Sequence, residues 1–236
     1  MKKYLLSFFT CIAFTSAFAQ KTELHFALNS GLFSFSGKAA NAVSYISYND
    51  DNQSGHTNNP FGAKSAISYG FSGNLKRITK RNFILGLDLG YESLRSKVTI
   101  NTVNGYTGNS TYQLEATGKT ILSSDFINIF PSLGHRFNTN KVAIDLTGGF
   151  DIGANLKMQE SGKATAVDGT VFTTDVDRKT ISTDVRPRIQ VSANYNKMGI
   201  YAGYSYGFLS YKAGYVGGST ECVARFVRFG LTYQLF

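Results

Sequence analysis

The sequence predicts an all-β protein, a transmembrane antiparallel up-and-down β-barrel of about eight strands, preceded by a cleaved signal peptide. Apolar and polar residues alternate with a period of two in separate short segments, which is typical of strands with one apolar face. No segment after residue 19 approaches the roughly 20 apolar residues that a spanning helix requires. Short and long connections also alternate along the chain. Only a closed barrel can take strands across hydrocarbon, because it leaves no sheet edge unpaired.

The N-terminal segment has the features of a secretory signal. Met1-Lys2-Lys3 supplies positive charge, residues 4–19 contain no charged side chain, and Ala17-Phe18-Ala19 forms a small-x-small cleavage site. The alternative is a buried hydrophobic helix. We expect residues 1–19 to be the signal peptide and residues 20–236 to form a single barrel domain.

The alternation is clearest in two central segments. Residues 83–92 place Phe83, Leu85, Leu87, Leu89 and Tyr91 on one face, opposite Gly86, Asp88, Gly90 and Glu92. Residues 142–155 place Val142, Ile144, Leu146, Phe150 and Ile152 on one face, opposite Asp145, Thr147, Asp151 and Asn155. A soluble sheet produces the same pattern, so the alternation alone leaves both a sandwich and a barrel open.

Four more segments follow the same rule. Their apolar faces carry Ile67, Tyr69, Phe71 and Leu75; Ile127, Ile129 and Leu133; Val185, Ile189, Val191 and Tyr195; and Val227, Phe229, Leu231, Tyr233 and Leu235. The first and seventh segments are less regular. Leu24, Phe26 and Leu28 alternate before Phe33 and Phe35 change parity, and the run Tyr201, Tyr204, Tyr206 and Phe208 leaves the outward face undetermined.

The lengths of the connections favour a barrel over a sandwich. Short connections lie near residues 77–82, 138–141 and 196–198, and long polar ones near 37–63, 99–118, 158–178 and 210–220. Strict alternation of short and long connections is the asymmetry of membrane barrels, which have short periplasmic turns and longer extracellular loops. A sandwich offers no reason for it.

The C-terminal segment resembles the terminal strand that the barrel assembly machinery recognises. It reads Phe229-Gly230-Leu231-Thr232-Tyr233-Gln234-Leu235-Phe236 and ends on an aromatic residue. With residues 130–137, which resemble a fourth-strand region, it makes the mature chain similar to the small outer-membrane barrels of the OmpA, OmpX and OmpW type common in Bacteroidota. The resemblance implies a location in the outer membrane of a Gram-negative bacterium and an assembly signal at Tyr233 and Phe236. Phe236 departs in parity from Tyr233, so either the last residue bends out of the ladder or the signal is read from Tyr233.

The polar faces of the segments carry charges of both signs. An eight-stranded ring encloses a space just wide enough for side chains, which predicts a filled lumen. Opposite charges inside it can neutralise one another, whereas unpaired burial would be costly. We expect a structural ion-pair lattice of Asp88, Glu92, Arg136, Asp145, Asp151, Asp184, Arg186, Arg188 and Arg228. The alternative is that these side chains line a narrow path for a solute.

Basic residues gather near both ends of the segments, and the formal net charge is +9. Because the chain is exported, we expect no nucleic-acid partner. Cations at the outer rim can pair with anionic groups of lipopolysaccharide, and the candidates are Lys97, Arg178 and Lys179. Ordinary solvated loop charge is the alternative. The expected partners are therefore outer-membrane lipid, lipopolysaccharide and the barrel assembly machinery, and the expected state is a monomer.

Prolines and aromatic residues add two local expectations. Pro131 and Pro187 fall inside expected strands, where each removes a hydrogen-bond donor, so we expect bulges there. The chain has no Trp, so Tyr and Phe must form the interfacial girdles, which we assign to Tyr91, Phe137, Tyr195, Tyr206 and Tyr233.

The sequence carries no convincing catalytic constellation. Some small barrels modify lipid A, but none of the histidines, His25, His56 and His135, begins the His-x-Ser pair of the deacylase barrels. No phosphate loop, zinc spacing or calcium loop is present, so we expect neither a metal nor a cofactor.

We expect a structural or surface-interaction barrel with a filled lumen and long extracellular loops, and no enzymatic activity. Loops such as residues 49–55 are polar and suited to contacts with other cells or molecules. The alternative is a passive channel for small or apolar solutes, as in OmpW-like proteins. A lipid A-modifying enzyme ranks third.

Overall fold

The computed structural model describes residues 19–215 and 220–236, and these residues form strands and connections without any helix. None of the described residues therefore belongs to a helix long and apolar enough to cross a membrane. The strands are β1 (Ala19–Ser36), β2 (Val43–Asn49), β3 (Ser54–Thr57), β4 (Lys64–Thr79), β5 (Phe83–Thr107), β6 (Ser110–Asn138), β7 (Ala143–Ala166), β8 (Val171–Asp177), β9 (Thr183–Tyr195), β10 (Met198–Tyr206) and β11 (Val223–Gln234). The predicted signal peptide lies outside the described residues, except for Ala19.

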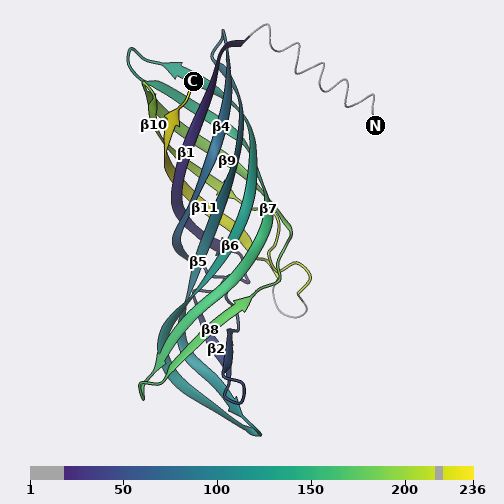
Figure 1. Cartoon of the computed structure of the whole chain (residues 1–236). Coiled ribbons are helices and arrows are strands. Elements are labelled where there is room, and N and C mark those ends of the chain that lie inside the picture. The colour runs from purple at the N-terminus through teal and green to yellow at the C-terminus, as the bar shows by residue number, and fades with distance from the viewer. Residues whose placement is uncertain (1–18, 216–219) are drawn as a thin grey trace.

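Eight of the strands close into an antiparallel ring, which confirms the predicted fold class. The ring runs β1-β4-β5-β6-β7-β9-β10-β11 and closes where β11 pairs with β1 from His25↔Gln234 to Ser36↔Val223. Figure 1 shows the ring at the top and a long extension of the sheet below it. Because every ring strand has two neighbours, no backbone edge is left open around the wall.

One end of the ring carries the short turns, and we call it the turn end. The connections here are residues 80–82, 139–142 and 196–197, and the C-terminal Phe236 lies at the same end. Asn82 and Asn196 have positive φ angles of 62° and 52°, a backbone region that Asn tolerates better than most residues. The three short connections were predicted at these places.

The outer face of the ring is apolar, as the alternation predicted. Every predicted outward residue of β4, β5, β6, β7, β9 and β11 is exposed or half-buried. In β1, Leu32 points outward while Phe33 and Phe35 are buried inside. The strand keeps its alternation, and the change of parity arises because the lumen itself is apolar at this level. In β10, Ile200, Tyr204 and Tyr206 face outward and Tyr201 faces inward.

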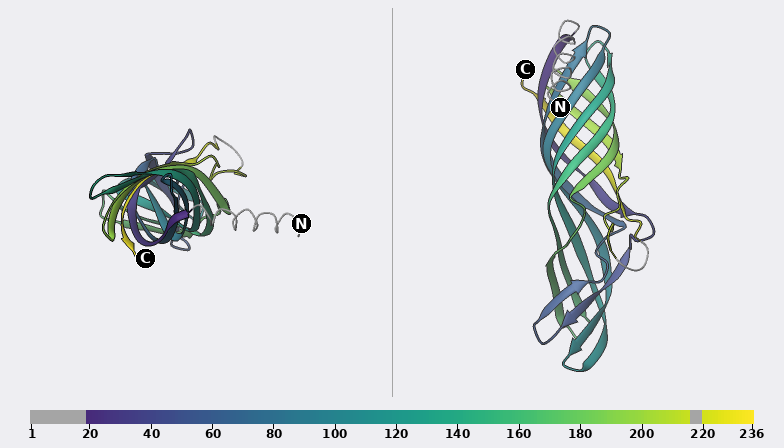
Figure 2. Two further views of the ribbon diagram at one scale, coloured as in Figure 1. Left: turned by 90° about the horizontal axis from the view of Figure 1, so that it is seen from above. Right: turned by 90° about the vertical axis from the view of Figure 1, so that its right-hand side faces the viewer.

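Three of the four long connections on the other side of the ring consist largely of strands, which corrects the prediction for residues 37–63, 99–118 and 158–178. The described residues of the fourth, between β10 and β11, form no strand. Strands β5, β6 and β7 continue past the ring, and β5 pairs with β6 as far as Thr107↔Ser110. Strand β2 joins β5 in parallel, β3 pairs with β2, and β8 pairs with β7. The resulting order β3-β2-β5-β6-β7-β8 forms a curved sheet, which we call the extension (Figure 2). Polar composition suggested loops, but in the extension the polar residues form the outer face.

The extension has a hydrophobic core of its own. It is built from Ile46, Val98, Ile100, Val103, Ala116, Ala164, Ala166 and Phe172, and Tyr48 and Leu114 pack against it. These residues come from β2, β5, β6, β7 and β8. The core explains why the segment folds as a sheet, since a hydrophobic face that several strands share is what stabilises short strands in water.

The predicted bulges at the two prolines are wrong. The register of β6 against β7 is the same at Ile129↔Ile152 and Ser132↔Gly149, on either side of Pro131. Pro187 pairs with Phe150 without a shift. Each proline lacks the backbone N–H donor of other residues. The neighbouring strands of the closed ring nevertheless keep the same pairing register on both sides of it. The irregularity between β6 and β7 lies instead at Asp125/Phe126, where the ring gives way to the extension.

Candidate functional site

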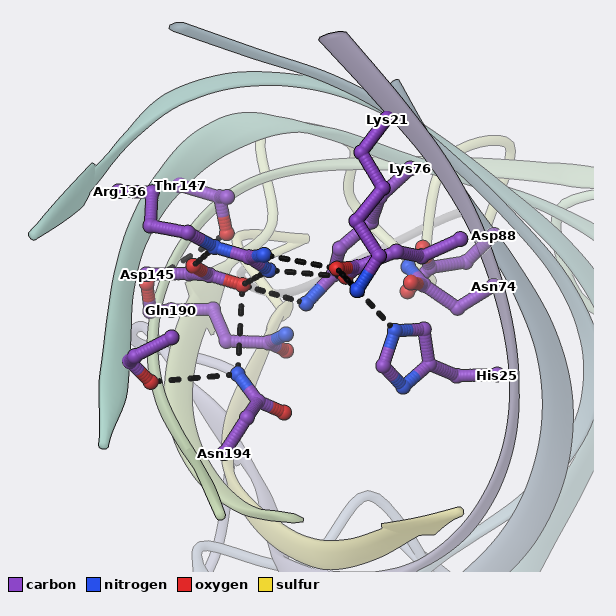
Figure 3. A network of polar contacts seen from close by, with 12 residues as sticks. Lys21, His25, Asn74, Lys76, Asp88, Arg136, Asp145, Thr147, Gln190 and Asn194 are labelled. Atoms are coloured by element: carbon purple, nitrogen blue, oxygen red, sulfur yellow. Dashed lines mark hydrogen bonds and ion pairs between the residues drawn. The ribbon is translucent and has the colours of Figure 1, made fainter. Parts of the chain in front are cut away.

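The lumen at the turn end holds a cluster of buried charges, which we call the turn-end cluster. It consists of Glu23, Lys76, Arg136 and Asp145. The guanidinium of Arg136 donates to both oxygens of Glu23, at 2.8 and 2.9 Å, and to both oxygens of Asp145, at 2.6 and 2.9 Å. Lys76 Nζ lies 2.8 Å from Asp145 Oδ2. In Figure 3, Arg136 and Asp145 extend from one wall of the ring and Lys76 approaches them from the opposite wall.

A second buried group, the mid-barrel cluster, lies further along the lumen. Arg228 Nη2 contacts both Glu92 Oε1 and Asp151 Oδ2 at 2.9 Å. Arg188 Nη1 lies 3.1 Å from Asp151 Oδ1, and Arg186 Nη2 lies 3.5 Å from Glu92 Oε2. Asp88 and Asp184 contact Arg188 and Arg186 at longer distances of 3.8 and 3.6 Å. The nine residues proposed for an ion-pair lattice are therefore all brought into the lumen, in two groups.

Two lattice members were missed at the sequence level, Glu23 and Lys76. Both lie on the inner face of their strands, opposite in parity to Leu24 and Leu75. This opposite parity is the sequence feature that could have placed both residues on the inner face. Glu23 lies close to the start of the first segment and Lys76 next to the short connection near residues 77–82, so neither was expected inside.

The lattice is nearly balanced in charge. Within the described part of the ring the buried acids are Glu23, Asp88, Glu92, Asp145, Asp151 and Asp184, and the buried bases are Lys76, Arg136, Arg186, Arg188 and Arg228. Balance matters because an ion left alone in a buried site costs several kcal/mol, roughly what a small protein's whole stability amounts to. The arrangement can hold the wall together. The cavity beside Asp88, Glu92 and Arg188 in the middle of the lumen measures only ≈ 10 Å³. At the turn end the lumen opens into a polar hollow of ≈ 480 Å³ that Glu23 and Arg136 help to line.

An apolar plug closes the lumen where the ring meets the extension. It is formed by Phe33, Phe35, Ala39, Phe61, Leu94, Leu122, Phe126, Met158, Tyr211, Cys222, Ala224 and Phe226. Tyr211, from the connection after β10, contacts Phe35 edge-on and donates to Asp184 Oδ2 at 2.5 Å. Burial raises the pKa of the Cys222 thiol to about 12. The charged lumen is thus sealed from the extension by hydrocarbon.

The extension contains a separate buried polar network. Glu160 accepts from the backbone N–H of Thr57 at 2.5 Å and from Arg178 Nε at 2.6 Å. Arg178 also donates to the carbonyl of Thr57, and the Thr57 hydroxyl lies 2.7 Å from that of Thr120. This network ties β3 to β6, β7 and the end of β8. Arg178 is therefore a structural residue of the extension, which corrects its assignment as a lipopolysaccharide contact.

The other two lipopolysaccharide candidates remain at the surface. Lys97 is half-buried on the outer face of β5, beside Lys64 of β4, at the level where the ring ends. Lys179 is exposed after β8. The structure does not bring the two side chains together with Arg178 in one patch.

The far tip of the extension carries a polar, tyrosine-lined hollow of ≈ 530 Å³. Its lining includes Ser47, Asn104, Tyr106, Tyr112 and Gln113. Asp50 accepts from the Tyr112 hydroxyl at 2.9 Å, and burial together with this carboxylate raises the pKa of Tyr112 to about 12. Asn49 Nδ2 donates to the Tyr106 hydroxyl at 2.5 Å. The tip is thus ordered by side-chain contacts and presents aromatic and amide groups to solvent.

The histidines are dispersed. His25 Nε2 lies 3.2 Å from Glu23 Oε2 in the lumen. His56 is exposed on β3, and His135 lies on the outer wall between Phe83 and Phe137, with ring centroids 5.4 and 4.8 Å away. No two of the three share a site.

The predicted assembly signal lies at the turn end. Tyr233 faces outward between Phe26 and Met198. Strand β11 ends at Gln234, but the hydrogen bonds continue: Leu235 N donates to Leu24 O at 2.8 Å, and Leu24 N donates to Phe236 O at 3.0 Å. Phe236 therefore stays attached to β1 by its backbone.

Comparison with known proteins yields structural similarity and little sequence similarity. No protein-family profile and no curated protein matches the chain. Ail, the attachment invasion locus protein of Yersinia pestis, is similar at 11% identity and a TM-score of 0.38, over 92% of this chain and 100% of that chain. Neisserial surface protein A is similar at 10% identity and a TM-score of 0.36, over 91% and 99%. The barrel assignment rests on the strand pairing of this chain and not on these distant similarities.

Proposed function

We propose that this chain is an outer-membrane surface protein of a Gram-negative bacterium. The ring crosses the membrane, and the extension stands outside the cell and makes contacts with other molecules. One observation carries the proposal: the exposed face of the ring is apolar, and the exposed face of the extension, built on the same strands, is polar.

The apolar belt supports the membrane part of the proposal. Leu89, Leu133 and Ile67 are 59%, 66% and 67% exposed, and similar residues surround the ring on all eight strands. Soluble monomers rarely leave so large a continuous apolar surface in water. In hydrocarbon, these exposed apolar side chains carry no unfavourable hydration free energy.

The outer face of the extension supports the surface part. Ser161, Lys163 and Thr165 alternate on β7 with the buried residues of the core, and Thr173 and Asp175 do the same on β8. These side chains suit water. Since the extension is an ordered sheet, it can present the tip at a distance from the membrane without the entropy cost of ordering a flexible loop.

The filled lumen favours a non-conducting role. Two charge clusters and the apolar plug occupy it along its length, and solute passage would require separating buried ion pairs. Planar-bilayer recordings on the refolded chain should show no steady conductance. A large, stable conductance would transfer support to the passive-channel alternative.

Site-specific labelling tests the orientation. We expect Asn109→Cys, at the tip of the β5–β6 hairpin, to react with a membrane-impermeant maleimide on intact cells. Asn140→Cys, in a short turn, should react only after lysis. The unsubstituted chain is the control, because its Cys222 is buried. Labelling of Asn140→Cys on intact cells would refute the proposed topology.

Lipopolysaccharide contact is proposed for Lys97 and Lys179. Both are surface cations on the extension side, where anionic lipopolysaccharide faces the exterior. The double substitution Lys97→Gln with Lys179→Gln should reduce the lipopolysaccharide that stays with the purified protein. Arg178 is left intact, because its loss would disturb Glu160 and confuse the result. Equal retention by the variant and the unsubstituted protein would discard these contacts.

A further inference from the structure

The turn end of the ring carries a set of surface cations, which we call the basic ring. It consists of Lys21, Arg77, Lys80, Arg81, Lys141 and Lys197. All are exposed except Arg77, which is half-buried. They come from β1, from the end of β4, and from all three short turns, so they are distributed around the wall and do not form one patch.

The basic ring has almost no opposing surface charge. The acidic side chains near this end are Glu23 and Asp145, and both are buried and paired within the turn-end cluster. Of the basic ring, Lys21 alone contacts one of them, at 3.0 Å from Glu23. The acids on the surface of the described residues all lie toward the extension: Asp50, Asp51, Glu115, Asp125, Asp168, Asp175, Asp177 and Glu221.

The basic ring lies immediately beyond the last outward-facing apolar residues of the ring strands. Arg77 follows Leu75 by two residues, Arg81 precedes Phe83 by two, and Lys197 stands between Tyr195 and Met198. Leu75, Phe83, Tyr195 and Met198 all face outward and are exposed. Cations that begin where the apolar belt ends lie at the level of lipid headgroups.

We propose that the basic ring binds the phosphate groups of anionic lipids in the leaflet on the turn side. The inference rests on the proposed membrane placement of the barrel. A distribution around the wall favours lipid headgroups, which surround a barrel, over a soluble anionic polymer, which would need a continuous patch. The uncompensated charge then has a physical role, since anionic headgroups supply the counter-charge that the protein lacks at this end.

The test uses one lysine from each turn. Lys80→Gln, Lys141→Gln and Lys197→Gln are combined in a turn variant, and Lys119→Gln, Lys163→Gln and Thr165→Glu are combined in a control variant with the same change of net charge on the exposed face of the extension. Each protein is reconstituted in phosphatidylcholine vesicles that contain phosphatidylglycerol. The readout is the association of spin-labelled phosphatidylglycerol relative to spin-labelled phosphatidylcholine. Lys21 and Arg77 are left unchanged, because Lys21 contacts Glu23 and Arg77 Nε is buried.

We expect the unsubstituted protein to prefer phosphatidylglycerol, and the turn variant to lose about twofold or more of that preference while the control variant keeps it. Substitution of the same turn lysines by arginine should preserve the preference, and 0.5 M salt should weaken it. Equal preference in the turn variant and the unsubstituted protein overturns the proposal. Loss of binding to purified peptidoglycan with unchanged lipid preference also overturns it, in favour of a polymer.

The same experiment distinguishes a failure of the lipid site from a failure of the proposed membrane placement. Failure of the unsubstituted protein to insert into vesicles at all would reject the membrane placement and, with it, the basic ring as a lipid site. Normal insertion without lipid preference rejects the lipid site alone. The shift in migration between unheated and heated samples on gels shows whether each variant has folded.

Discussion

The ring and the extension share three strands but reverse the chemistry of their two faces. Along β5, outward Leu85 and Leu89 and inward Asp88 and Glu92 belong to the ring. Past this point the outward face of the same strand carries Arg95, Lys97 and Thr99, and the inward face carries Leu94, Val98 and Ile100. Inward and outward residues alternate without interruption from Leu85 to Ile100, so the strand keeps the same side toward the interior in both regions. The apolar face thus changes sides between Glu92 and Leu94. In the proposed placement, this is the level at which hydrocarbon gives way to water.

The largest effect should follow from breaking the charged interior of the ring. Arg228→Met leaves Glu92 and Asp151 without their 2.9 Å partner. We expect it to lower the free energy of unfolding by about 3–5 kcal/mol, measured by urea titration in detergent. Val227→Met, at an exposed outward position of the same strand, should change it by less than about 0.5 kcal/mol. Similar losses in both variants would mean that the lattice is not what holds the wall.

A lysine placed on the outer face of each region tests the reversal directly. Leu89→Lys should destabilise the ring in lipid by about 2–4 kcal/mol, because it places a charge near the middle of the belt. Thr165→Lys, which faces outward on β7 of the extension, should be close to neutral. Unfolding titrations in vesicles provide the comparison. A tolerated Leu89→Lys would argue that the belt does not face hydrocarbon.

A smaller effect is expected from the core of the extension. Ile46→Val removes one methyl group from a fully buried site and should cost about 1 kcal/mol. The cost should fall on the extension alone, seen as faster amide hydrogen exchange in β2 and β3 with unchanged exchange in β10. Uniform acceleration across β10 as well would show that the two regions unfold as one unit.

The smallest expected effect is a change in the rate at which the thiol of Cys222, in the apolar plug, is labelled. Its buried thiol has a pKa raised to about 12, so at neutral pH it stays protonated and out of reach of reagents. The folded protein should resist thiol labelling at pH 8 and react once urea unfolds the plug. Tyr211→Ala, which removes an edge-on contact of Phe35 and the partner of Asp184, should speed labelling without unfolding the ring. Rapid labelling of the unsubstituted folded protein would contradict the closed plug.

The comparison also explains the prediction that failed. Residues 99–118 and 158–178 were expected to be loops because they are rich in Thr, Ser and Gly. In an aqueous sheet such residues form the outer face, and the small inward residues Ala164 and Ala166 carry too weak an apolar signal to stand out. The two residue types did alternate there, but the inward residues were only slightly more hydrophobic than the outward ones. In the ring the contrast between the two faces is high, because large apolar residues on the outer face alternate with charged residues on the inner face.

The sequence by itself determined the all-β class, the eight ring segments, the outward residues of six of them and the sites of the short turns, because alternation and turn residues are local properties of the chain. It also identified nine lattice residues from their parity. Tertiary structure decided which charges meet across the lumen, that Glu23 and Lys76 join them, and that Arg178 is half-buried and paired with Glu160. It alone joined β2, β3 and β8 to the extended strands, because pairing between segments far apart in sequence depends on a shared core that no single segment reveals.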